Sequence, residues 1–153
     1  MKKTEKTENV VKVFNLIKNA KYSKMSDTDK LVIYRIFKAI KKLSESFTEE
    51  VNDAQQRLIP YETFMQDLQT AQAYEIARSK KETFDGMTEE EYNTFIQQFT
   101  KYNQLVKQAV KESAEKEVEI EFDPLTAEGF DKLRLSNDWT FAQADEVESF
   151  VCE

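Results

Sequence analysis

The chain has 153 residues and a net charge of −7, with 33% charged and 12% aromatic side chains but only two glycines and two prolines. This length suits one domain with a hydrophobic core, and the scarcity of turn-forming residues predicts a mostly helical chain with few loops. The absence of histidine excludes Ser-His-Asp and Cys-His catalytic arrangements, and the single cysteine, Cys152, excludes an internal disulfide and a zinc cluster.

Charge is distributed unevenly along the sequence. Residues 1–42 carry 12 basic and four acidic side chains, a net charge of +8, whereas residues 43–153 carry 10 basic and 25 acidic ones, a net charge of −15. Such a split can hold the two ends of a chain together or steer self-association. A homo-oligomer is therefore one expectation for this protein.

The N-terminal residues contain lysines but no apolar segment of the kind found in secretory signals, and no run of apolar residues approaches membrane-spanning length. Together with the single cysteine, this predicts a reduced, cytosolic setting. We interpret Cys152 as a packed small side chain, the alternative being a reactive thiol.

Helical periodicity begins at the N-terminus. Val10, Val13, Phe14 and Ile17 predict a short amphipathic helix within residues 8–20. Ser26 is the expected N-cap of a long helix from Asp27 to Ile59. Its apolar positions recur every three or four residues, close to a heptad pattern: Ile33, Ile36, Ile40, Leu43, Phe47, Val51, Ala54 and Leu58.

A second long helix is predicted to follow a weaker apolar stripe over residues 64–78 and a turn at Asp85–Gly86. Thr88 and Glu91 form a capping-box pattern, and apolar residues then keep helical spacing to about Glu115. Each long helix has one apolar stripe to bury, so residues 8–116 are predicted to form an antiparallel helical hairpin.

Residues 117–122 break the helical pattern. Val118, Ile120 and Phe122 alternate with Glu117, Glu119 and Glu121, which predicts a short strand. No other stretch alternates as well, so no internal partner strand is expected. The segment is predicted to lie poorly paired on the hairpin or to add to a sheet of a partner protein; lysines opposite the glutamates would relieve repulsion.

Two short helices are predicted after the strand. Thr126 can cap the first, and Thr140 with Gln143 forms a capping-box pattern at the start of the last. Trp139 is interpreted as packing the last helix onto the body of the protein, with an exposed anchor for a partner as the alternative.

The clearest candidate contact surface is a basic stripe of Arg35, Lys38 and Lys42 on one helical face. It can be a solvated face, a contact for an acidic protein surface, or a nucleic-acid contact, although the acidic majority of the chain disfavours nucleic acid. Glu117, Glu119, Glu121 and Trp139 are further candidate contacts. No catalytic, metal-binding or cofactor-binding residues are predicted.

The segment "EKEVEIEFDPLTAEGFDKLRLSNDWTFAQADEVESF" resembles the ending of small helical proteins encoded by tailed bacteriophages and prophages. That group has no assigned activity, and this chain departs from it by an extra segment around residues 64–86.

The expectation is one all-α domain, 1–153, with the hairpin region 8–116 followed by a strand and two short helices over 117–153. The resemblance implies a location in the cytoplasm of a bacterial host or in a virion. The expected function is a non-enzymatic structural, assembly or accessory role of a phage protein through protein–protein contacts. The alternatives are an acidic inhibitor of a host defence system and a small nucleic-acid-associated factor.

Overall fold

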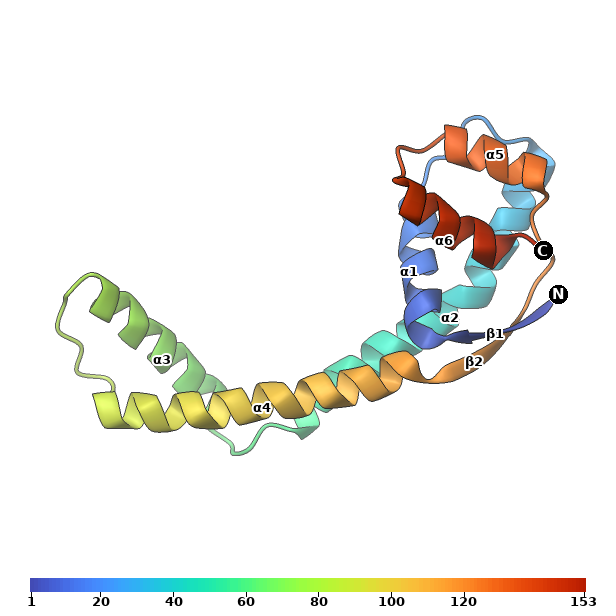
Figure 1. Ribbon diagram of the computed structural model, residues 1–153. Coiled ribbons are helices and arrows are strands. Elements are labelled where there is room, and N and C mark those ends of the chain that lie inside the picture. Colours follow the sequence, from blue (N-terminus) through green and yellow to red (C-terminus); the bar gives the residue numbers. More distant parts are fainter. The chain divides into compact units, whose positions relative to one another are not determined.

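The computed structural model describes all 153 residues as six helices and one two-stranded antiparallel sheet (Figure 1). A mostly helical fold with one short β element, as predicted, is therefore confirmed. The elements in chain order are β1 (Lys2–Lys6), α1 (Thr7–Lys18), α2 (Asp27–Arg57), α3 (Phe64–Ser79), α4 (Glu89–Glu115), β2 (Glu117–Glu121), α5 (Ala127–Leu135) and α6 (Phe141–Val151).

The chain divides into two compact units. Unit 1 comprises Met1–Glu50 and Glu112–Glu153, and unit 2 comprises Val51–Lys111. The helices α2 and α4 each contribute residues to both units. Whether the two units form the single domain predicted over 1–153 stays a prediction.

Unit 1 is built around one hydrophobic core. Ile33, Ile36 and Ile40 of α2 are at most 3% exposed and pack with buried residues of α1, β2, α5 and α6. The first half of the apolar face of α2 is therefore buried, as predicted, in a core that these elements share. Heptad spacing identifies which face of a helix is buried without specifying its partner, and several short helices here offer apolar stripes.

Unit 2 has a separate aromatic core in which α3 packs on α4. The fully buried Phe64 ring lies 5.4 Å from the Phe95 ring and 5.0 Å from the Tyr102 ring, between centroids. The Tyr102 hydroxyl also donates to the Gln55 carbonyl at 2.8 Å, which ties the end of α2 to α4. The weak stripe after Pro60 is thus a helix that supplies the central residue of this core.

The predicted helix starts are present. The backbone N–H of Glu91 donates to the Thr88 hydroxyl at 3.1 Å, ahead of α4. Thr126 accepts from the N–H of Gly129 at the start of α5, and Thr140 forms a complete capping box with Gln143 at the start of α6. Each cap satisfies backbone donors that have no partner within the helix.

The strand β2 has an internal partner, so the prediction that none exists was wrong. It pairs antiparallel with β1, from Lys2 opposite Glu121 to Lys6 opposite Glu117. The ladder continues at both ends: Met1 and Phe122 exchange two backbone hydrogen bonds, and the N–H of Thr7 donates to the Lys116 carbonyl at 2.9 Å.

Charge complementarity explains why the segment KKTEK serves as the partner. Since Met1 and Phe122 form a hydrogen-bonded pair, Lys2–Glu121 and Lys6–Glu117 occupy non-hydrogen-bonded positions, where facing side chains come closest. All four of these side chains are exposed, on the solvent face of the sheet. Opposite charges at facing positions stabilise a sheet, whereas glutamates alone would repel.

Candidate functional site

The predicted basic stripe lies at the surface of unit 1. Arg35, Lys38 and Lys42 are all exposed on the side of α2 away from its buried isoleucines. None of the three forms an ion pair within 4 Å; on this helix, that interaction is limited to Lys41 and Glu45, at 3.9 Å. The structure thus brings the three predicted cations together on one free face.

The other predicted contact residues lie on β2 and just before α6. Glu117, Glu119 and Glu121 are exposed on β2, with Lys2 and Lys6 opposite the two outer glutamates. Trp139 is half-buried and packs against the core of unit 1, as expected for the packing interpretation.

Cys152 is half-buried at the end of α6 and packs against the same core. Burial, followed by the nearby carboxylates of Glu148 and Asp131, raises the pKa of the Cys152 thiol. A raised pKa lowers the thiolate fraction at neutral pH, which supports the interpretation of a packed side chain over a reactive one.

A surface groove that was not predicted runs between α1 and α2. It consists of two adjoining cavities of about 310 and 700 Å³, which share Lys18 and Phe37. We call it the α1–α2 groove. The first cavity is lined by Ile17, Lys18, Tyr22, Lys30, Ile33, Tyr34 and Phe37. The second is lined by Val11, Phe14, Asn15, Lys18, Phe37, Lys41, Ser44, Glu45, Phe47, Thr48 and Glu49.

Aromatic rings form the apolar surface of the groove. The rings of Phe14 and Phe37 stack with centroids 5.2 Å apart. Tyr34 lies three residues before Phe37 on α2 and is 55% exposed. The Tyr22 hydroxyl donates to the Ile17 carbonyl, and burial raises the pKa of Tyr22, so its ring stays neutral. The groove therefore keeps a large uncharged area in contact with water.

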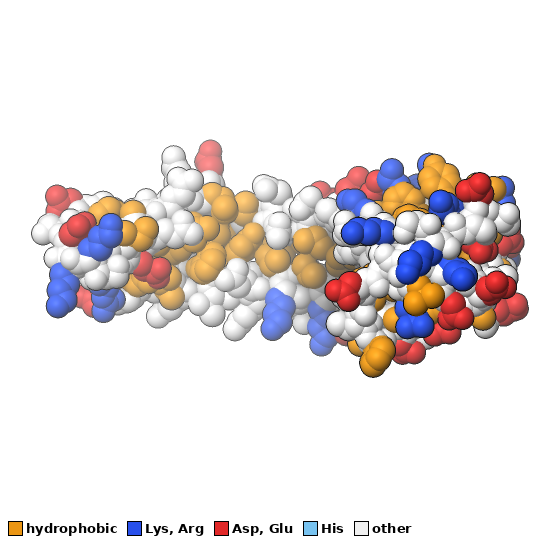
Figure 2. All heavy atoms as spheres, turned by 90° about the horizontal axis from the view of Figure 1, so that it is seen from above, with side chains coloured by type: hydrophobic (Ala, Val, Ile, Leu, Met, Phe, Trp, Pro, Cys, Tyr) orange, Lys and Arg blue, Asp and Glu red, His pale blue; other side chains and the backbone are white.

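The edge of the groove is basic around the first cavity. Lys18 and Lys30 are exposed there, and the Lys18 ammonium lies 5.9 Å from the centre of the Phe14 ring. Carboxylates are confined to the second cavity, at Glu45 and Glu49, and Glu45 is paired with Lys41. One end of the groove thus combines aromatic surface with unneutralised positive charge. Figure 2 shows hydrophobic and basic side chains adjoining on the face of unit 1 in that view.

The dimensions of the groove suit a helical segment. On α2 it extends from Lys30 to Glu49, which at ~1.5 Å per residue is about 29 Å, or just over five helical turns. An amphipathic helix laid into such a groove places an apolar side chain on it at every turn. The chain contains no group of three or more His, Cys, Asp or Glu that could hold a metal ion.

The groove was missed because Phe14, Ile17 and Ile33 were placed on stripes expected to be buried, and the aromatic residues beside them on α2 were given no role. Tyr34 and Phe37 directly follow the buried Ile33 and Ile36, so each lies about 100° further round the helix. This second row makes the apolar stripe of α2 wider than a single heptad row. The width of the stripe was the available signal, and Phe47, expected in the core, is half-buried at the far end of the groove.

Comparisons with known protein families, with curated proteins and with solved structures found no match. The resemblance to phage proteins therefore stays a prediction. None of the helices combines the length and the apolar character that crossing a bilayer requires.

Proposed function

We propose that this protein acts through protein–protein contacts, in a structural, assembly or accessory role, and that the α1–α2 groove binds an acidic amphipathic helix. The observation that carries this proposal is the combination of Tyr34, more than half exposed, with the unpaired cations Lys18 and Lys30 at the same end of the groove. Apolar area drives association, and the charges select the partner.

The free energies of apolar burial and of ion pairing support a partner that has apolar anchors with acidic side chains beside them. Full burial of one leucine or phenylalanine side chain contributes roughly 1.5–3 kcal/mol, so two or three anchors give a measurable affinity. Ion pairs at the rim of an interface contribute less free energy but accelerate encounter and discriminate against basic partners. A helix with leucines facing Tyr34 and Phe37, and glutamates facing Lys18, satisfies both requirements.

The phage-related roles predicted from the C-terminal segment fit this mode of action, because structural and accessory proteins work by binding other proteins. The inhibitor alternative is weaker. An acidic mimic needs a face of carboxylates without cations beside them, whereas Glu117 and Glu121 lie opposite Lys6 and Lys2 in the sheet, although neither pair is within ion-pair distance.

A nucleic-acid-associated role is a second candidate, favoured by the exposed and unpaired stripe of Arg35, Lys38 and Lys42. Phosphates are neutralised by such faces, and the resulting affinity falls steeply with salt. This stripe lies outside the lining of the groove, so the two functions are separable by substitution.

The test uses a labelled synthetic peptide that has leucines at helical spacing and glutamates elsewhere, titrated with the full chain by fluorescence anisotropy. We expect binding that Lys30→Glu and Tyr34→Ser each weaken about tenfold, equivalent to about 1.4 kcal/mol. Lys132→Glu, an exposed change on α5, is the matched control and leaves binding intact. Equal binding of a peptide with lysines in place of the glutamates, or no effect of the two groove variants, would overturn the proposal.

A further inference from the structure

The last helix of this chain presents an unusual exposed side chain. Phe141, the first residue of α6, is 90% exposed, more than any other large hydrophobic residue in the protein. The cap of α6 is provided by Thr140 and Gln143, so helix initiation does not require phenylalanine here. A single exposed apolar residue is common on protein surfaces; its neighbours decide whether it has a role.

Those neighbours are acidic. Asp145 and Glu148 lie four and seven residues after Phe141 on α6, so the three share one side of the helix. All three side chains are exposed, while Ala144, Val147, Phe150 and Val151 are buried in the core. We call Phe141, Asp145 and Glu148 the α6 ridge. It has an apolar anchor followed by two carboxylates.

We propose that the α6 ridge of one copy of this chain binds in the α1–α2 groove of a second copy. The inference rests on the proposed function of the groove and names its partner. The ridge has the chemistry that the groove selects, an aromatic anchor with carboxylates beside it, on a helix whose other face is already occupied. In the free chain Phe141 is exposed, so it does not occupy the groove of its own molecule.

The size of the groove fits this occupant. The cavity beside Tyr34 has a volume of about 310 Å³, whereas an apolar cavity of ~150 Å³ is sufficient for benzene. With the Phe141 ring in this cavity, the carboxylates of the ridge lie near the entrance, where Lys18 and Lys30 carry the positive charge. The uneven distribution of charge along the sequence also favours this contact. The groove cations come from the basic first 42 residues, and the ridge carboxylates come from the acidic remainder.

The contact joins two different surfaces, so each copy offers one ridge and one groove. Contacts between unlike surfaces close into rings, of which a reciprocal pair is the smallest, or continue as open filaments. Self-association of this kind would suit an assembly role. It also makes a specific prediction for mixtures of variants, because a copy that lacks one surface still carries the other.

The test measures molecular mass by sedimentation of the full chain over a wide range of concentrations at low salt. We expect the mass to rise with concentration. Phe141→Ser and the double variant Lys30→Glu/Tyr34→Ser should each raise the dissociation constant for self-association at least tenfold. An equimolar mixture of these two variants keeps one intact ridge and one intact groove, and should form pairs but nothing larger. Leu135→Ser, which removes another exposed apolar side chain of unit 1, is the control and should associate as the unmodified chain does.

The inference is overturned if the unmodified chain stays monomeric throughout, if Phe141→Ser associates normally, or if the mixture of variants stays monomeric. Trp139 fluorescence checks that each variant is folded, because this side chain packs against the core of unit 1. The acidic peptide separates the two proposals. If the peptide binds in the groove but the chain does not associate, the proposed function stands and the second copy is not the partner; if neither occurs, both fail.

Discussion

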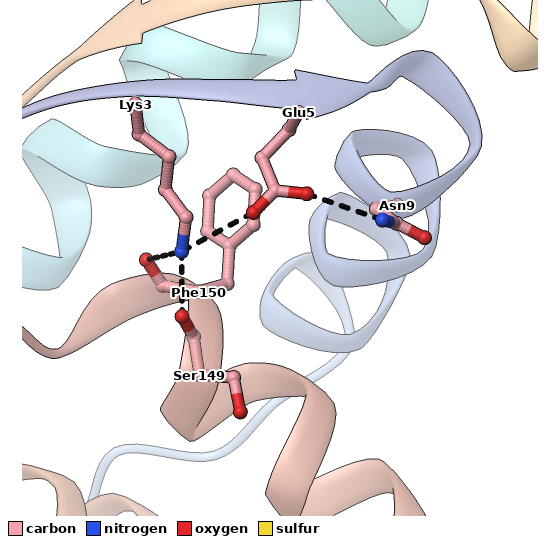
Figure 3. Close-up of polar contacts among 5 residues, drawn as sticks. All are labelled: Lys3, Glu5, Asn9, Ser149 and Phe150. Atoms are coloured by element: carbon pink, nitrogen blue, oxygen red, sulfur yellow. Dashed lines mark hydrogen bonds and ion pairs between the residues drawn. The ribbon is translucent and has the colours of Figure 1, made fainter.

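Lys3 links β1 to the end of α6 (Figure 3). Its ammonium group donates to the carbonyls of Ser149 and Phe150, at 2.5 and 3.3 Å, pairs with Glu5 at 3.3 Å, and lies 5.0 Å from the centre of the Phe150 ring. The last turn of α6 has no basic residue of its own. Lys3 therefore supplies, from the other end of the sequence, the cation that helix C-termini favour.

Substitution of Lys3 should lower the stability of unit 1. Lys3→Met keeps most of the aliphatic stem but removes the charge and the hydrogen bonds, so we expect a loss of about 1–2 kcal/mol in the free energy of unfolding. Urea unfolding followed by Trp139 fluorescence measures it. Lys2→Met, on the solvent face of the same strand, is the control and should stay within about 0.5 kcal/mol of the unmodified chain. Equal effects of the two substitutions would contradict the role assigned to Lys3.

Tyr61 in unit 2 should titrate at unusually high pH. Its hydroxyl donates to Asp67 at 2.8 Å, and burial, together with that bond and the Asp67 charge, raises the pKa of Tyr61 from 10.0 to about 12. Between these two values the unfolded chain loses a proton that the folded chain keeps, so this residue lowers folding stability as pH rises through that window.

Ultraviolet absorbance during an alkaline titration measures this effect. We expect Tyr61→Phe to remove a phenolate step near pH 12 and Asp67→Asn to move that step to lower pH. An absorbance curve that Tyr61→Phe leaves unchanged at high pH would show that the tyrosine is not shifted.

Among the elements, β1 was the hardest to predict. Its sequence, KKTEK, has no alternation of apolar and polar residues, because the side of the strand that faces the protein carries Lys3 and Glu5, which are engaged by α6 and by each other. Burial patterns cannot identify such a strand. The only sequence signal was charge, lysines available to face the glutamates of β2, and it was considered only as a condition on self-pairing.

Ile120 tests how β2 holds the C-terminal helices. It is 4% exposed and belongs to the same core as Phe130 and Phe150 of α5 and α6. Ile120→Asp would bury a carboxylate without a partner, which is strongly unfavourable. We expect amide hydrogen exchange to show lost protection over residues 126–150, with α3 and the first half of α4 less affected. Val118→Asp, at a half-buried position of the same strand, should have a smaller effect. Unchanged protection over 126–150 in Ile120→Asp would refute this role.

At the scale of the whole molecule, the helices were predicted well and their packing partners were not. Start signals and periodicity are local, so Thr140 and the α2 isoleucines could be assigned from neighbouring residues alone. The division into two cores depends on which apolar faces meet, and residues such as Phe64 and Ile40 look alike in a sequence pattern. The groove depends on an apolar face that remains uncovered. A sequence pattern does not distinguish such a face from one that is buried.

Two separate cores predict separate responses to mutation. Phe64 is fully buried among the rings of unit 2, so Phe64→Ala should destabilise that unit by about 3–5 kcal/mol. Trp139 belongs to unit 1, and its fluorescence transition in urea should shift less than the loss of helical circular dichroism. The half-buried Phe47 lines the groove, so Phe47→Ala should destabilise the protein less than Phe64→Ala does. Coincident transitions for both probes in Phe64→Ala would show that the units unfold as one.

The charge of the whole molecule sets the expectation for nucleic acid. The stripe of Arg35, Lys38 and Lys42 can neutralise about three phosphates, which corresponds to a salt slope of about −3 and to weak non-specific binding. The remaining surface belongs to a chain with a net charge of −7, which repels the rest of a duplex. We therefore expect no sub-micromolar binding to labelled duplex DNA by anisotropy at physiological salt.

A tight, salt-steep interaction that disappears when all three cations are replaced by alanine would overturn this expectation and favour the nucleic-acid role over the groove. The groove double variant Lys30→Glu/Tyr34→Ser is the comparison in that assay, because Lys30 lies outside the stripe and a contact specific to the stripe should largely survive its loss.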